Sequence, residues 1–204
     1  MFLSLQRGFI LVMICALFWI SCSVPTPNSS TFVPDTVATY FPIRRFILGE
    51  AYLLSGQPYT LERTTILNGK RDTGLVALYD VPWGGIMKDF LAADIGHPRF
   101  MDQYRVSSFF EESTNTDQLF YEAIDPKLFT RLMTVGLNHE TKRPVSIYAE
   151  TASGNTWSHR VQKLYYAPLK IVQIQEFVTS RMGPDKSSRV EYKFQRSRDD
   201  DYEL

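Results

Sequence analysis

The residues that could carry chemistry are few and lie far apart in the chain. The three histidines, His97, His139 and His159, are not paired four residues apart, and none belongs to a His-Glu-x-x-His sequence. A metal site would have to be assembled from distant segments. No Gly-x-Ser-x-Gly or Ser-x-x-Lys sequence occurs, which disfavours serine hydrolases of those kinds. We interpret the histidines as surface or turn residues and expect no metal and no catalytic residue.

Two further groups of charged residues could suggest a catalytic or phosphate-binding site, but each has a simpler interpretation. Asp89 and Asp94 stand five residues apart on an expected helix, about 140° around its axis, so they do not form an acid and base pair. The basic residues after Asn68-Gly69 lack the glycine pattern of a phosphate-binding loop and are interpreted as the flank of a turn. We therefore expect no cofactor and no enzymatic activity.

Both cysteines, Cys15 and Cys22, lie within the first 22 residues. Without cysteine in the rest of the chain, structural disulfides, zinc ribbons and thiolate catalysis are excluded there. Around these cysteines, Arg7 precedes an apolar run from Phe9 to Ile20, the pattern of a secretory signal peptide. The run is shorter than the roughly 20 apolar residues of a membrane-spanning helix. We predict a signal peptide over 1–22.

The sequence Trp19-Ile20-Ser21-Cys22 resembles the lipobox of bacterial lipoproteins, although Trp19 stands where an aliphatic residue is usual. The resemblance implies that Cys22 is lipidated and becomes the first residue, so that a membrane is the partner of the chain. Ser23 implies passage to the outer membrane, with the protein facing the periplasm. Two alternatives remain: an ordinary signal peptide cut near Ser23, and an uncleaved membrane anchor.

Composition indicates a globular domain with no net charge to create a strong electrostatic field at its surface. Hydrophobic residues make up 44%, and 22 basic residues balance 22 acidic ones, so we expect no nucleic-acid binding. The length of 204 residues suits one domain. The Pro- and Ser-rich segment 23–40 is predicted to be a flexible tether, 41–196 a single α+β domain, and 197–204 a disordered acidic tail.

Apolar periodicity predicts helices over 42–54 and 82–94, with Gly56 ending the first. Asn68-Gly69 between two β-favouring runs predicts a hairpin with a type I′ turn. From residue 104 onward, short runs alternate with turn residues, and such short connections imply antiparallel pairing. Those runs cover 104–112, 117–124, 127–137, 144–151, 156–166, 170–180 and 188–196. We predict an α+β fold in which two N-terminal helices pack on a large antiparallel meander sheet of about six to eight strands.

The strand region is rich in aromatic residues, and packing on the helices accounts for most of them. A concave sheet lined by aromatics could instead hold a lipid tail or a sugar.

Segments around Asn68-Gly69-Lys70, Phe90-Leu91-Ala92-Ala93-Asp94-Ile95 and Asp125-Pro126-Lys127-Leu128-Phe129 resemble a group of small, uncharacterised lipoproteins from Bacteroidetes-type bacteria. The resemblance spans much of 43–135 and implies lipid anchoring and one domain. It supplies no catalytic residue.

Two hypotheses follow. The first is a non-enzymatic cell-envelope lipoprotein that acts as an interaction or structural module towards another envelope protein. The alternative is a half-barrel binder or carrier of an apolar ligand such as a lipid. A sheet whose concave face is filled by the two helices favours the first, and an open apolar interior favours the second. We expect a filled face, because the apolar sides of both helices must be buried.

Overall fold

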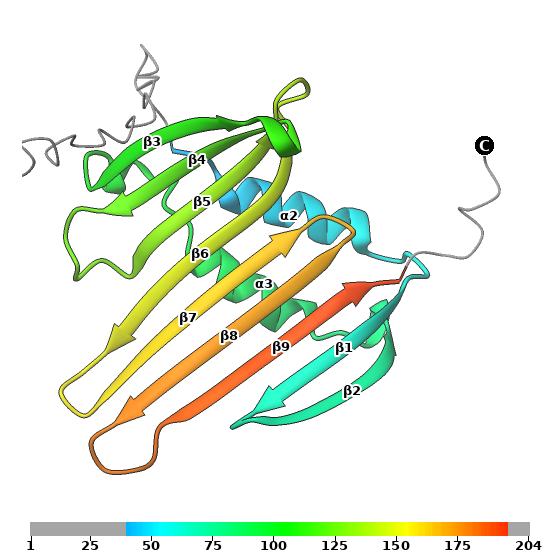
Figure 1. Cartoon of the computed structure of the whole chain (residues 1–204), viewed down its shortest axis with the longest axis vertical. Coiled ribbons are helices and arrows are strands. Elements are labelled where there is room, and N and C mark those ends of the chain that lie inside the picture. Colours follow the sequence, from blue (N-terminus) through cyan, green and yellow to red (C-terminus); the bar gives the residue numbers. More distant parts are fainter. Residues whose placement is uncertain (1–39, 196–204) are drawn as a thin grey trace, which may run out of the picture.

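The computed structural model describes residues 40–195, which form one nine-stranded antiparallel sheet and two α-helices (Figure 1). The helices are α2 (Ile43–Leu54) and α3 (Trp83–Ala92). Short 3-10 turns occupy Leu78–Asp80, Pro98–Phe100 and Glu112–Thr114. No helix among the described residues is long and apolar enough to cross a membrane.

The strands follow one another along the sheet except at the first hairpin. They are β1 (Thr60–Leu67), β2 (Lys70–Ala77), β3 (Tyr104–Glu111), β4 (Thr116–Ala123), β5 (Thr130–Asn138), β6 (Pro144–Gly154), β7 (Ser158–Ala167), β8 (Ile171–Ser180) and β9 (Lys186–Phe194). Their spatial order is β2-β1-β9-β8-β7-β6-β5-β4-β3. Strands β3 to β9 thus form a meander, and the β1–β2 hairpin joins it by pairing β1 with β9. The sheet remains open, with β2 and β3 as its edges.

The predicted α+β outline is confirmed, with two helices and an antiparallel sheet, but the sheet has nine strands rather than six to eight. The difference arises because the β1–β2 hairpin, which lies between the two helices in the sequence, belongs to the same sheet. It joins the sheet by pairing β1 with β9, for example Leu61 with Phe194. No local sequence pattern predicts this pairing. The hairpin turn is as predicted, since Asn68 and Gly69 both have positive φ. Cys22, nearly all of the tether and the tail lie outside the described residues.

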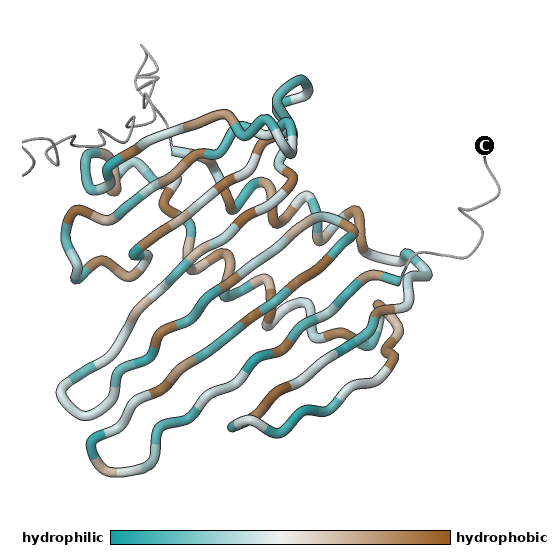
Figure 2. Tube along the Cα trace, in the orientation of Figure 1, coloured by the Kyte–Doolittle hydropathy of each residue, from teal (hydrophilic) through white to brown (hydrophobic). Residues whose placement is uncertain are grey.

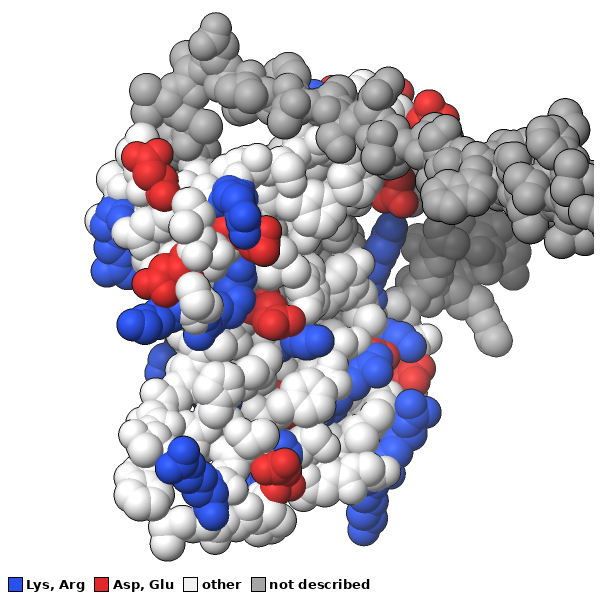
Figure 3. All heavy atoms as spheres, turned by 60° about the vertical axis from the view of Figure 1, so that its left-hand side comes forward, with Lys and Arg blue, Asp and Glu red and all other residues white. Residues whose placement is uncertain are grey.

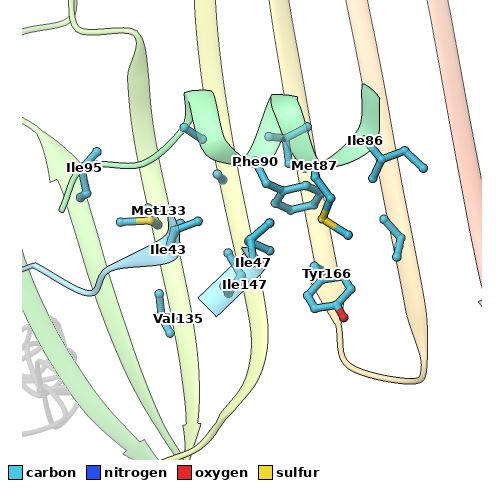
Figure 4. Close-up of a cluster of buried hydrophobic side chains, with 14 of the residues drawn as sticks. Ile43, Ile47, Ile86, Met87, Phe90, Ile95, Met133, Val135, Ile147 and Tyr166 are labelled. Atoms are coloured by element: carbon cyan, nitrogen blue, oxygen red, sulfur yellow. The ribbon is translucent and has the colours of Figure 1, made fainter. Parts of the chain in front are cut away.

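Both helices lie on one face of the sheet, and they bury their apolar sides against it (Figures 1 and 4). Ile43 and Ile47 of α2 and Phe90 of α3 are fully buried. The strand residues of this cluster include Met133, Val135, Ile147, Leu164, Tyr166 and Val172. Each fully buried side chain of this size contributes about 1.5–3 kcal/mol.

Tyr166 joins the two helices to the sheet. Its ring packs edge to face on Phe90 of α3, with centroids 6.1 Å apart, and also contacts Phe46 of α2. Its hydroxyl donates a 2.7 Å hydrogen bond to Glu50 Oε2, so the polar tip is satisfied despite burial. Burial raises the pKa of this hydroxyl strongly, with the neighbouring Glu50 carboxylate adding to the effect.

Hydrophobic and polar residues alternate along several strands (Figure 2), and the buried hydrophobic residues of the strands lie on the helix side of the sheet. In β6, for example, Ile147 and Ala149 are buried, whereas Tyr148 and Glu150 are only partly buried. Helix side chains therefore fill the centre of this face of the sheet, as predicted from the sequence.

Candidate binding surface

The histidines take separate positions, and only one joins a cluster of polar groups. His97 Nδ1 accepts a hydrogen bond from the amide of Arg99 at the start of a 3-10 turn. His159 lies exposed in β7. His139 instead bonds to Asp117 across the β4–β5 hairpin, a partnership that its sequence position does not reveal. Across residues 40–195, no group of three or more His, Cys, Asp or Glu side chains could hold a metal ion.

A pocket of about 400 Å³ opens on the helix side of the sheet, where β3, β4 and β5 extend beyond the helices. It is lined by Ser108, Phe109, Phe110, Asp117, Leu119, Leu137, His139 and Lys142. Leu119 pairs with the core residue Val135, which places its side chain on the helix side of the sheet. The volume falls within the range of small-ligand sites, and the walls are apolar apart from one charged rim.

Asp117 organises that rim. Its two carboxylate oxygens lie 2.8 Å from His139 Nδ1 and 2.6 Å from Lys142 Nζ. The hydrogen bonds from Lys142 and then His139 lower the pKa of Asp117. The His139 ring also contacts Phe110, with centroids 4.5 Å apart. The rim therefore combines one anion with two cationic or polar donors above an apolar floor.

The turn after β5 brings Lys142 back beside Asp117 at this rim. Asn138 Oδ1 accepts hydrogen bonds from the amides of Glu140 and Thr141, which tightens the turn. Lys142 itself adopts a left-handed conformation with φ of 54°. This reversal directs its side chain towards Asp117.

Strand β3, beside the pocket, is an edge strand with apolar residues on both faces. Val106, Phe109 and Phe110 are 43%, 51% and 45% exposed. The other edge, β2, begins with the charged residues Lys70, Arg71 and Asp72. Charges on an edge strand discourage pairing with other chains. The central part of β3, residues 106–110, has no such charge.

A second polar cluster joins α3 to the sheet. Gln162 Nε2 lies 3.4 Å from Asp89 Oδ2 and 3.3 Å from Glu176 Oε2, and Arg160 Nε donates to Glu176 at 2.7 Å. Burial raises the pKa of Asp89, and Arg160 only partly opposes this effect. The cluster satisfies its own charges and is best explained as a polar contact between helix and sheet.

Asp94, the other acidic residue considered with this helix, lies just beyond the end of α3. Its Oδ1 accepts a hydrogen bond from the Gly96 amide, and its Oδ2 lies 3.7 Å from Arg44 Nε. Asp89 and Asp94 thus have different partners, as their spacing predicts. Elsewhere on the surface, Figure 3 shows basic and acidic side chains interspersed on the viewed face, without an extended patch of one sign.

Comparison with known proteins gives little further information. No family model matches the chain, and no curated protein matches it. Among solved structures, the chain is similar to the S-type phycobiliprotein lyase of Guillardia theta, with 10% identity and a TM-score of 0.25. The match covers 78% of this chain and 96% of that protein. This similarity is too low to carry an argument about function.

We expect Asp89→Asn to stabilise the fold at neutral pH. Burial raises the pKa of Asp89 in the folded protein above the ordinary aspartate pKa of ~4. The protonated carboxyl therefore stabilises the fold below that ordinary pKa. This contribution is lost as the pH rises through the pKa of the folded state. The asparagine side chain stays neutral at every pH, while its amide oxygen still accepts from Gln162. Urea unfolding should show a higher midpoint for the variant at pH 7 and a shrinking difference in acid.

The matched control is Asp185→Asn in the exposed β8–β9 turn, which should show no such pH-dependent gain. A variant at Asp89 that is less stable than the wild type at pH 7 would contradict the assignment.

Proposed function

We propose that this protein is a non-enzymatic, lipid-anchored module of the bacterial cell envelope, held by Cys22 on the periplasmic side of the outer membrane. The lipobox-like sequence before Cys22 and the resemblance to small Bacteroidetes-type lipoproteins support this location. Residues 23–39 separate Cys22 from the described fold and, at ~3.3 Å per extended residue, reach at most roughly 55 Å.

We further propose that the module acts by binding another polypeptide at β3 and the neighbouring pocket. The observation that carries this proposal is the contrast in charge between the two edges of one sheet: β2 begins with three charged residues, whereas residues 106–110 of β3 are uncharged and expose Val106, Phe109 and Phe110. An added strand gains main-chain hydrogen bonds, and pockets beside the edge select its side chains. The pocket that Phe110, Leu119 and Leu137 line lies where such a selecting pocket is needed.

A specific observation favours an apolar ligand as a second candidate. The concave centre is filled, but the 400 Å³ pocket remains open, and Asp117, His139 and Lys142 form a polar rim beside its apolar floor. A molecule with an apolar body and one polar end group matches this arrangement. The chemistry of the site is thus apolar contact beside a polar rim.

The anchor is tested by Cys22→Ser in cells that express the full chain. Loss of the acyl chains removes about 0.8 kcal/mol per buried methylene, so we expect the protein to move from the membrane pellet to the soluble periplasmic fraction. Cys15→Ser, within the same apolar run, should leave it in the pellet. If the Cys22 variant stays membrane-bound, the lipid anchor is wrong.

The polypeptide-binding role is tested by a photo-crosslinking amino acid at Phe109 of β3, compared with the same group at exposed Leu75 of β2. We expect one defined adduct from Phe109 and none from Leu75, because only the apolar edge pairs with another strand. Mass spectrometry of the adduct identifies the protein attached. Equal labelling from both edges, or none from either, would rule out this role.

The ligand-binding candidate is tested with 1-anilinonaphthalene-8-sulfonate, an aromatic anion whose fluorescence rises in apolar sites. Leu119→Trp should fill the pocket and reduce the fluorescence gain, whereas Leu75→Trp on the opposite edge should not. Unchanged fluorescence in the Leu119 variant would show that the pocket is not the binding site.

A further inference from the structure

We propose that the strand recognised by β3 is β3 of a second copy of this chain, paired antiparallel about a two-fold axis at Ser108. This inference rests on the proposed binding role of the β3 edge and names its partner. Four features of β3 carry the argument: the direction of its backbone groups, its charges, its apolar side chains and the neighbouring pocket.

At alternate residues of β3, the backbone amide and carbonyl groups point to the free edge of the sheet. The Ile124 amide donates to the Gln103 carbonyl just before β3 begins, which fixes the hydrogen-bonding phase of the β3–β4 pair. Because bonded pairs alternate along an antiparallel ladder, Ser107 and Phe109 bond to β4, and the amides of Val106 and Ser108 point away from it. Among the described residues, no strand pairs with that side.

Self-pairing centred on Ser108 matches the residues whose amide and carbonyl groups point away from β4. Each Ser108 faces the other, and Val106 faces Phe110 of the second copy. These opposed residues can therefore form the hydrogen bonds of an antiparallel ladder. A two-fold axis perpendicular to the sheet also keeps the helix sides of both copies on the same side. The pairing therefore extends one sheet into the next without reversing its faces.

Charge selects this register over its neighbours. Centring on Ser108 places Arg105 opposite Glu111 of the second copy, and the symmetry repeats this opposite-charge pair. A shift of the centre to Ser107 would place Arg105 opposite Phe109, and a shift to Phe109 would place Glu111 opposite Ser107. The Arg105 side chain is 70% exposed and already lies 3.4 Å from Glu122, so the new contact would extend an existing ion pair.

The exposed apolar side chains of β3 also complement themselves in this register. Phe109 faces Ser107 of the second copy, and the small serine leaves space for the phenyl ring. On the helix side, Val106 and Phe110 face one another across the axis. Burial of these side chains removes the apolar exposure of Val106, Phe109 and Phe110.

The second copy also completes the pocket. Phe110 lines the pocket on the side of the free edge. In the proposed pairing, Val106 of the second copy lies opposite Phe110 and closes that side. Each copy therefore contributes a residue to the pocket of the other, and any ligand of the pocket would be sensitive to dimer formation.

The register is tested by Ser108→Cys in the full chain. Directly opposed residues of a hydrogen-bonded pair have Cα atoms about 5.5 Å apart, within the range of a disulfide. With no other cysteine after Cys22, mild oxidation of membranes should give a disulfide-linked dimer on non-reducing gels. Ser107→Cys and Thr73→Cys should stay monomeric. Efficient linkage through position 107 instead of 108 would overturn the register.

A second pair of variants tests the edge itself in the soluble Cys22→Ser background. Ser108→Pro removes an amide that points away from β4, so the fold should survive while the dimer dissociates in light scattering. Ser107→Pro removes an amide bonded to β4 and should lower the melting temperature. A Ser108→Pro protein that melts normally and remains dimeric would overturn the proposal.

These outcomes also separate the inference from the broader proposal. If Phe109 captures another envelope protein while Ser108→Cys gives no linked dimer, the binding role stands and self-pairing is wrong. If neither Phe109 nor Ser108→Cys captures a partner, both proposals fail.

Discussion

Burial of an apolar stripe on one face of the sheet is the constraint on which the rest of the structure depends. Strands β4 to β9 each place hydrophobic residues on the same side, and α2 and α3 supply the side chains that cover them. Ile43, Ile47 and Phe90 fill the space that would otherwise be an open interior (Figure 4). Because protein interiors pack as densely as organic crystals, the filled centre leaves no room for a ligand there.

The dimensions of the helices explain why the proposed binding surface lies beyond them. At 1.5 Å per residue, α2 and α3 are only about 18 and 15 Å long, whereas nine strands at ~4.8 Å span about 38 Å. The helices therefore cannot cover the whole face. Near α3 the sheet carries Arg160 and Glu176, which pair with each other, and Gln162, which bonds to Glu176. Towards β3 it carries Phe110, which is 45% exposed and lines the pocket.

Local chemistry made much of this fold predictable, whereas the pairings between distant segments were not. Asn68-Gly69 determines the first hairpin, and Pro42 and Pro82 precede the two helices as their fixed φ requires. The first half of β2, Lys70 to Gly74, is polar and has no strand pattern of its own, and it forms a strand by pairing with β1. The pairing of β1 with β9 joins residues more than a hundred positions apart, and no periodicity reports it. The rim of the pocket was unpredictable for a related reason, since only the register of the β4–β5 hairpin brings Asp117 and His139 together.

The two edges of the sheet provide an internal comparison for the binding surface. β2 and β3 have the same length and the same unpaired position, so exposure alone does not distinguish them. Their sequences do: β2 places three charged residues at its start, and β3 confines its charges to Arg105 and Glu111, on either side of an uncharged Val-Ser-Ser-Phe-Phe segment. An uncharged edge of this composition is prone to pairing. Opposite charges on either side of that segment also favour one antiparallel register over the others, which unspecific aggregation does not require.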